Sequence, residues 1–325
     1  MLRKFLTGTL AALACSLGQA AEPVNFGIIS TESAAHLKAD WAPILEEMSQ
    51  ATGYEVKAYF ATDYAGIIEA MRFKKVDVAW MGNKSGIEAV DRAGGEVFAQ
   101  TTYADGSPGY WSLLITHKDS PYHSVDDVLK NAKSINFGLG DPNSTSGTAV
   151  PGYYVFAKNG VDPRTAFKTA RPANHEANLM AVASGQVDVA TNNTEALEKF
   201  TKRSPEKAAE VRVIWKSPLI PADPMVWRAD LDSAKKQKIK AFLLSYGQGD
   251  SDLAKAQLAR LNKLTFGAFK DSSNAQLIPI RQLILAKQKL QLEADTTLSA
   301  ADKQAKLAEL DKQLADLNTQ LAAAH

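Results

Sequence analysis

Residues 135–150 read INFGLGDPNSTSGTAV, which is the pattern of an apolar strand, a turn of small polar residues and the start of a helix. The first N–H groups of a helix have no partner within it, and the helix dipole places positive charge at the same end. With the hydroxyls of Ser144, Thr145 and Ser146, this turn is suited to bind an oxyanion. A serine that only caps the helix would give the same pattern. Pro151 either kinks this helix or begins a later one.

The N-terminus has the features of a secretory signal peptide. Two basic residues precede an apolar run over 5–17, which is too short to span a membrane, and small residues follow it. We expect export of the chain and cleavage after Ala20. A lipoprotein signal is the alternative, because Cys15 lies within this segment behind Ala-Leu-Ala.

The composition argues against several function classes. Removal of residues 1–20 takes away two of the 37 basic residues and none of the 36 acidic ones, which leaves a net charge of −1. A nearly neutral chain gives no sign of a nucleic-acid-binding surface. Cys15 is the only cysteine in the sequence, so the mature chain would have neither disulfides nor thiol chemistry.

Two short motifs recur 111 residues apart in the sequence. They are VNFGI at 24–28 against INFGL at 135–139, and VDVA at 76–79 against VDVA at 187–190. The shared spacing indicates two equivalent halves. Each half reads as strands alternating with helices, which favours an α/β fold of two lobes with parallel sheets. Ligands of such folds bind at the carboxyl ends of the strands.

The same spacing pairs Tyr64 with His175, each at the start of the second helix of its half. If the halves face each other, both side chains enter the cleft between them. Taken singly, Tyr64 reads as a core aromatic and His175 as an exposed helix residue. Residues 108–115 and 220–227 read as two extended crossings between the lobes, which together make a hinge. We therefore expect a signal peptide over 1–20, lobe 1 over 21–107 and 225–280, lobe 2 over 108–224, and C-terminal helices over 281–325.

The C-terminal segment carries a heptad seam behind Ser299, a candidate N-cap. Its members are Leu307, Leu310, Leu314, Leu317 and Leu321. Two heptads are too few for a stable isolated coiled coil, so the seam must pack against another helix. That helix belongs either to the same chain, over 283–292, or to a second subunit. The sequence leaves both open and leans towards a homodimer.

No catalytic pattern emerges from the sequence. The histidines lack metal-ligand spacing, and neither a G-x-S-x-G elbow nor a Walker loop occurs. Ser144 with His175 as its base would be the one hydrolase arrangement. We therefore expect a binding protein without a metal or cofactor rather than an enzyme.

Two acids are placed to face the cleft. Glu195 follows the repeated strand at 187–190, and Asp223 lies between two prolines in the second crossing. Each also fits a simpler role, as a helix-start carboxylate or as an Asp-Pro turn. Opposite a hydroxyl-rich turn, the two carboxylates would bind the cationic end of a zwitterion whose other end is an anion.

Several of these segments resemble the periplasmic phosphonate-binding proteins of ABC transporters. The matching segments are DPNSTSG at 141–147, VPGYY at 150–154, VDVATNNTE at 187–195, WKSPLIP at 215–221, DYAGII at 63–68 and DGSPGYW at 105–111. The resemblance covers nearly the whole mature chain. It implies a two-lobed type 2 periplasmic binding fold in the periplasm, with 2-aminoethylphosphonate as ligand. The implied partners are a membrane permease and its ATPase.

The resemblance also implies roles for single residues. Ser144, Thr145 and Ser146 would hold the phosphonate group through hydroxyls and main-chain amides. Tyr64, Tyr110 and His175 would assist them, and Glu195 and Asp223 would receive the ammonium group. Met81 departs from the aromatic residue expected after Trp80, which leaves the pocket wall there undefined. Alternatives are a receptor for phosphite or methylphosphonate, and a sensor that docks to a membrane partner through its heptad tail.

Overall fold

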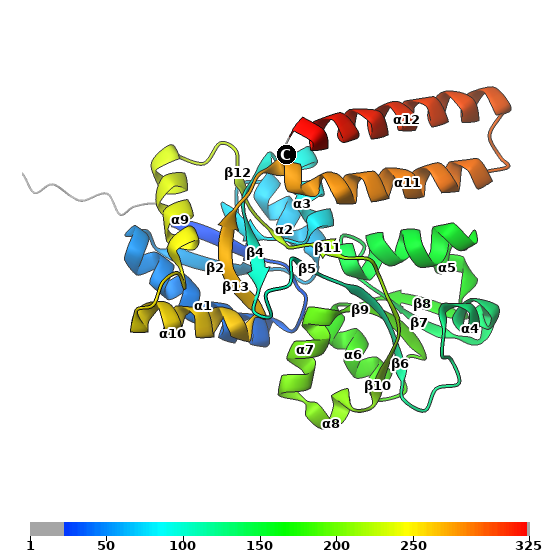
Figure 1. Cartoon of the computed structure of the whole chain (residues 1–325), viewed down its shortest axis with the longest axis horizontal. Coiled ribbons are helices and arrows are strands. Elements are labelled where there is room, and N and C mark those ends of the chain that lie inside the picture. Colours follow the sequence, from blue (N-terminus) through cyan, green and yellow to red (C-terminus); the bar gives the residue numbers. More distant parts are fainter. Residues whose placement is uncertain (1–22, 324–325) are drawn as a thin grey trace, which may run out of the picture.

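A computed structural model of the chain describes residues 23–323. The signal peptide, with its expected cleavage after Ala20, lies outside the described residues. Figure 1 shows two α/β lobes beside each other and a hairpin of two long helices along one side of them. Within 23–323, no helix combines the length and the apolar character needed to cross a membrane.

Lobe 1 is built on a six-stranded sheet in the order β13-β4-β12-β3-β1-β2. β1 pairs in parallel with β2 and β3, whereas β12 runs antiparallel to β3 and β4. The strands are β1 (Val24–Ile28), β2 (Val56–Phe60), β3 (Val78–Trp80), β4 (Gly95–Tyr103), β12 (Pro224–Arg228) and β13 (Phe266–Asp271). The helices are α1 (Ala34–Thr52), α2 (Tyr64–Arg72), α3 (Asn83–Arg92), α9 (Ser233–Ser245) and α10 (Asp252–Lys263), with a 3₁₀ turn, η5, at Asn274–Leu277.

Lobe 2 is built on a five-stranded sheet in the order β10-β6-β9-β7-β8. The strands are β6 (Ser112–His117), β7 (Asn136–Leu139), β8 (Thr169–Pro172), β9 (Val189–Asn193) and β10 (Val211–Lys216). The helices are α4 (Val125–Lys130), α5 (Pro163–Ala166), α6 (His175–Ala183), α7 (Thr194–Arg203) and α8 (Pro205–Ala208). Shorter helical turns are η1 (Ala132–Ser134), η2 (Thr145–Ala149), η3 (Gly152–Phe156) and η4 (Ala157–Asn159).

The predicted repeat is confirmed by equivalent hydrogen bonds in the two lobes. The main-chain N–H of Asn25 donates to Asp77 Oδ2 over 2.9 Å, and that of Asn136 donates to Asp188 Oδ2 over 2.7 Å. The strand registers agree as well, because Phe26 lies opposite Val78 and, 111 residues later, Phe137 lies opposite Val189. In each lobe the aspartate of the VDVA motif therefore fastens the first strand to the third.

The two predicted crossings are each broken into two strands. Besides β6 and β12, the crossings form β5 (Gly109–Tyr110) and β11 (Ile220–Pro221), which pair antiparallel as a small sheet of their own. A Cβ at Gly109 would lie 2.0 Å from the Ile220 carbonyl oxygen, so this close pairing requires glycine. The hinge is thus a two-stranded ribbon rather than two independent long strands.

The C-terminal segment folds back on its own chain. Figure 1 shows α12 (Ala300–Ala323) returning alongside α11 (Ile278–Ala294). Lys289 Nζ pairs with Asp311 Oδ1 over 2.5 Å, and Gln282 Nε2 donates to Asn318 Oδ1 over 2.7 Å. The five seam leucines are half-buried, and α12 has no fully buried residue. The seam therefore packs against a helix of the same chain, which is one of the two arrangements expected from the sequence.

Candidate functional site

The polar turn before η2 carries three buried hydroxyl residues, Ser144, Thr145 and Ser146. Ser144 is the N-cap, and its Oγ accepts the N–H of Gly147 over 2.9 Å. The N–H groups of Thr145 and Ser146 lie in the first turn, where the helix itself offers no acceptor. The turn thus combines hydroxyls, main-chain donors and the positive end of the helix dipole in a space shielded from water.

Pro151 lies inside this helix with φ −65°, so it neither ends the helix nor starts a new one. Wide π-helical turns occur on both sides of it. In an α-helix the residue at 151 would donate to the Gly147 carbonyl, which proline cannot do. That carbonyl instead accepts the Thr191 hydroxyl over 2.8 Å, and the Ser146 carbonyl accepts the Ser112 hydroxyl over 2.6 Å. The turn is therefore fastened to the sheet of lobe 2.

His175 starts α6 and is buried beside the polar turn. Its Nε2 lies 3.4 Å from Ser144 Oγ and 3.5 Å from Ser146 Oγ, while Nδ1 has no hydrogen-bond partner. Asn193 Nδ2 donates to Ser146 Oγ over 3.0 Å. Burial, with the charge of Lys199 acting in the same direction, lowers the pKa of His175 to about 4. The imidazole is therefore neutral at pH 7 and offers a dipolar contact to a ligand.

Glu195 and Asp223 are both buried, and their carboxylates interact. Burial raises the pKa of Glu195 to about 7, although the charge of Lys199 acts against it. Burial and the charge of Glu195 raise the pKa of Asp223 well above its usual range. Glu195 Oε1 and Asp223 Oδ1 have no hydrogen-bond partner. Unpaired buried carboxyl oxygens are costly, and a cation between them would remove the penalty.

Tyrosine side chains surround these groups. Burial raises the pKa of Tyr64 and Tyr110 well above the ordinary value, and the charges of Asp223 and Glu195 act in the same direction on both. The phenols therefore stay protonated and can donate hydrogen bonds. The main-chain N–H of Tyr64 donates to Asp141 Oδ2 over 3.1 Å, which ties α2 to the polar turn. All eight residues predicted for the site are buried, and the phenols lie close to the polar turn, with Tyr64 near Ser144 and Tyr110 near Thr145.

The sequence analysis did not predict two further aromatic residues at this cleft. Burial raises the pKa of Tyr103, at the end of β4, with the charge of Glu195 acting in the same direction, and the Trp80 indole is close enough to Asp223 to lower the pKa of that carboxyl. Tyr103 Oη and Trp80 Nε1 are buried donors without a partner. Each lies at the end of a lobe 1 strand, which was the available signal. Met81, in contrast, is fully buried in the core of lobe 1.

The structure has the lobes closed around this site. Across the cleft, the main-chain N–H of Lys84 in α3 donates to Thr145 Oγ1 over 2.8 Å. Farther from the hinge, Glu176 Oε2 accepts the N–H of Ser33 over 2.7 Å, and Glu176 Oε1 pairs with His36 Nδ1 over 2.6 Å. These contacts join residues of lobe 2 to residues of lobe 1 and exclude water from the cleft.

Ser144 and His175 are in contact but lack the other features of a catalytic serine and its general base. A general base works best with a pKa near the operating pH, and His175 has one near 4. No carboxylate orients its Nδ1, and Ser144 Oγ already accepts an N–H. The geometry therefore favours ligand binding over hydrolysis.

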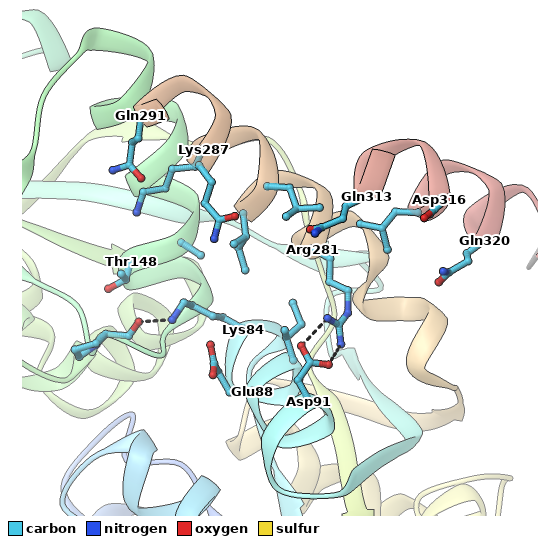
Figure 2. Close-up of a pocket in the computed structure, with 17 residues that line it drawn as sticks. Lys84, Glu88, Asp91, Thr148, Arg281, Lys287, Gln291, Gln313, Asp316 and Gln320 are labelled. Carbon is cyan, nitrogen blue, oxygen red and sulfur yellow. Dashed lines mark hydrogen bonds and ion pairs between the residues drawn. The ribbon is translucent and has the colours of Figure 1, made fainter. Parts of the chain in front are cut away.

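A separate cavity of about 810 Å³ lies beneath the helical hairpin, between α3, the polar turn and α11. Figure 2 shows Lys84 reaching across it to the Pro142 carbonyl, with 2.7 Å between Nζ and O. It also shows Arg281 held by both carboxylate oxygens of Asp91. None of the predicted site residues lines this cavity. It marks the place where the hairpin spans both lobes.

One group of possible metal ligands occurs in the part of the chain that the structure describes. His117, Asp119 and Glu210 place one ligand atom each within 4.8 Å of the others, far from the cleft at the edge of lobe 2. Lys118 Nζ pairs with Glu210 over 2.9 Å. An ammonium group already neutralises this carboxylate, so we assign the cluster to an ordinary surface ion network.

Comparisons with known proteins agree with this geometry. Residues 26–277 match the family described as ABC transporter, phosphonate, periplasmic substrate-binding protein. The chain is 54% identical to the phosphonates-binding periplasmic protein of Escherichia coli (strain K12) over 287 residues, which are 88% of this chain and 83% of that protein. It is 27% identical over 178 residues, 53% of this chain and 59% of the relative, to a probable ABC transporter phosphite-binding protein of Prochlorococcus marinus (strain MIT 9301).

The fold has a close match among solved structures. A binding protein component of an ABC phosphonate transporter from Pseudomonas aeruginosa superimposes with a TM-score of 0.89 at 55% identity, over 93% of this chain and 99% of that one. The predicted class, an α/β two-lobed type 2 periplasmic binding fold, is thereby confirmed. The chain belongs to the periplasmic substrate-binding proteins of phosphonate ABC transporters, a family that binds its ligands without transforming them.

Proposed function

We propose that the chain captures 2-aminoethylphosphonate in preference to other phosphonates and delivers it to a membrane permease driven by an ATPase. The observation that carries this proposal is the pair of buried carboxyl oxygens without partners, Glu195 Oε1 and Asp223 Oδ1, in a cleft that also holds a hydroxyl-rich helix start. An anion alone would leave this pair of carboxylates unpaired. A zwitterion satisfies both ends of the cleft.

In this proposal the phosphonate group binds at the polar turn. Its oxygens accept hydrogen bonds from the hydroxyls and amides of residues 144–146, with Tyr64, Tyr110 and His175 as further contacts. These groups are neutral, so the helix dipole and the converging donors replace a buried arginine or lysine. The ammonium group binds between Glu195 and Asp223, about one aminoethyl length away.

The same carboxylates would exclude inorganic phosphate. Phosphate fits the polar turn but leaves two buried acids facing each other in a dry cleft. Without a cation, the two acids either keep protons, as their raised pKa values indicate, or leave a buried charge unpaired, and either state costs free energy that the ammonium group would recover, so phosphate should bind more weakly. A receptor for phosphite or methylphosphonate is the second candidate, supported by the Prochlorococcus relative that is named as a probable phosphite-binding protein.

A thermal-shift and calorimetric series separates these ligands. The series contains 2-aminoethylphosphonate, its isostere propylphosphonate, methylphosphonate, phosphite, phosphate and sulfate. Because a ligand that binds only the folded state raises the melting temperature, the expected order has 2-aminoethylphosphonate first. Equal or tighter binding of propylphosphonate would refute the role of the two carboxylates. Tightest binding of phosphite or methylphosphonate would establish the second candidate.

We also propose that the C-terminal hairpin joins two copies of the chain. Support comes from the seam of α12, whose leucines are only half-buried against α11. The proposal is tested by light scattering of the full mature chain and of a variant that lacks residues 299–325. The full chain should have twice the mass of one subunit and the shortened chain the mass of one. A monomeric full chain would contradict the proposal.

A further inference from the structure

The cleft has a buried cation next to it that the ligand contacts described above do not use. Lys199 lies in α7 one turn after Glu195 and is 6% exposed. Its ammonium group pairs with Glu32, which lies in the loop after β1 in lobe 1 and is 4% exposed. Arg203, one turn farther along α7, also pairs with Glu32 and reaches Asp40 in α1.

These ion pairs depend on closure of the lobes. Both cations belong to α7 of lobe 2, and both acids belong to lobe 1. Opening at the β5–β11 ribbon would separate them, and Lys199 would then lack its carboxylate. The charge of Lys199 acts on Glu195, on Asp223 and on His175, so the ammonium group lies close to the cleft.

Glu195 is the alternative partner that the helix itself provides. Glutamate and lysine four residues apart, with the glutamate nearer the N-terminus, are the favourable order for an ion pair within a helix. In the closed form Glu195 Oε1 has no hydrogen-bond partner, because Lys199 is turned to Glu32. Lys199 therefore lies near both carboxylates, paired with Glu32 and close enough for its charge to act on Glu195.

We propose that Lys199 pairs with Glu195 when the lobes are open and with Glu32 when they close, so that closure frees Glu195 for the ammonium group of the ligand. This rests on the proposed function, in which Glu195 receives that group. Glu32 is then a specificity-determining residue that does not touch the ligand. Without Glu32, Lys199 stays on Glu195 and occupies the place of the ligand's ammonium group.

The test compares the dissociation constants of 2-aminoethylphosphonate and propylphosphonate by calorimetry. Glu32→Gln should weaken binding of 2-aminoethylphosphonate by about tenfold, which corresponds to about 1.4 kcal/mol. It should change the binding of propylphosphonate by less than about threefold. Asp40→Asn is the matched control, because it loosens the same interlobe contact at Arg203 without touching Lys199. It should affect both ligands alike.

Replacement of the lysine provides the decisive second arm. Lys199→Met leaves Glu32 paired with Arg203 and removes the cation that competes for Glu195. The preference of this variant for 2-aminoethylphosphonate over propylphosphonate, given by the ratio of their dissociation constants, should therefore equal or exceed that of the unmodified protein. The double variant Glu32→Gln/Lys199→Met should recover the ratio that Glu32→Gln loses. Circular dichroism melting shows that each variant is folded.

The two proposals fail in different ways. If the unmodified protein does not prefer 2-aminoethylphosphonate to propylphosphonate, the proposed function is wrong and this inference with it. If it does prefer 2-aminoethylphosphonate and Glu32→Gln keeps the same ratio, the exchange of partners alone is overturned. Loss of the ratio in Lys199→Met would also overturn it.

Discussion

The main-chain N–H of Lys84 in lobe 1 donates to the hydroxyl of Thr145 in lobe 2 over 2.8 Å. Thr145 thus belongs to the polar turn and to the contact between the lobes at once. A ligand that orders this turn also presents the Thr145 hydroxyl to Lys84. If the ligand binds at this turn as we propose, binding and closure are coupled through one side chain, and closure is the feature that a membrane partner can distinguish.

Thr145→Val tests this coupling, because valine has the shape of threonine without the hydroxyl. The part-buried N–H of Lys84 would lose its acceptor and the phosphonate would lose the Thr145 hydroxyl, which together cost about 1 kcal/mol or more. We expect calorimetry to show phosphonate binding about tenfold or more weaker. Thr145→Ser keeps the hydroxyl and should stay within about threefold of the unmodified protein. Full affinity in Thr145→Val would show that the interlobe bond does not contribute.

Glu195 predicts a pH dependence of stability in the ligand-free protein. Its pKa is about 7 in the folded chain against 4.5 ordinarily, so the folded chain keeps a proton that the unfolded chain has released. The stability from this group is fully present below pH 4.5 and is lost as the pH rises through about 7. His175 acts oppositely, since its pKa falls from 6.5 to about 4 and its contribution is lost as the pH falls.

Comparison of the Glu195→Gln variant with the unmodified protein isolates the contribution of Glu195 to the pH dependence, because His175 is present in both. Between pH 5 and pH 8 the melting temperature of the unmodified protein should fall relative to that of the variant by a few degrees, as about 1 kcal/mol corresponds to about 2 °C or more in a chain of this size. Differential scanning calorimetry across the range provides the measurement. Parallel curves would mean that the carboxyl is solvated in the free protein.

His175 is expected to serve the anion and not the amine. Since it is neutral at pH 7, His175→Gln keeps a polar neutral group and should weaken all phosphonates by about tenfold or less. His175→Phe keeps the size without the nitrogens and should weaken them further. The ratio between 2-aminoethylphosphonate and propylphosphonate should not change in either variant. Weaker binding of 2-aminoethylphosphonate alone would show that His175 contacts the amine end of the ligand, contrary to this prediction.

Glu176 should affect closure without selectivity. It holds the N–H of Ser33 and the imidazole of His36 across the outer edge of the cleft. We expect Glu176→Ala to weaken every ligand by a similar factor, about threefold to tenfold, and to shift the ligand-free protein towards the open form in small-angle scattering. Glu176→Gln retains an acceptor for Ser33 and should have a smaller effect. Unequal losses between ligands would show that Glu176 reaches the site.

Local sequence was sufficient to predict the repeat and to select candidate site residues, all of which are buried. The VDVA motifs have a fixed role, since Asp77 and Asp188 each fasten a neighbouring strand, and this made the spacing informative. The helix starts at Tyr64 and His175, which the 111-residue spacing pairs, agree with the structure. The polar turn was recognisable because its hydroxyls are consecutive in sequence.

Contacts that depend on closure or on irregular backbone were not predictable in the same way. Trp80 reads as a buried strand residue, and it lies near Asp223 because β12, which begins directly after Asp223, pairs with β3, a pairing between strands far apart in sequence. The pairing of Lys199 with Glu32 joins residues 167 positions apart and exists only between closed lobes. The π-helical turns flank Pro151, and the carbonyls of Gly147 and Ser146 accept hydroxyls of Thr191 and Ser112, which are far away in sequence and which no helical periodicity encodes.

The most direct test of the central claim is a crystal structure of the mature chain with 2-aminoethylphosphonate. The phosphonate oxygens should lie within hydrogen-bond distance of the hydroxyls and amides of residues 144–146, with the ligand nitrogen between the carboxylates of Glu195 and Asp223. A ligand in the reverse orientation, or bound outside this cleft, would contradict the account.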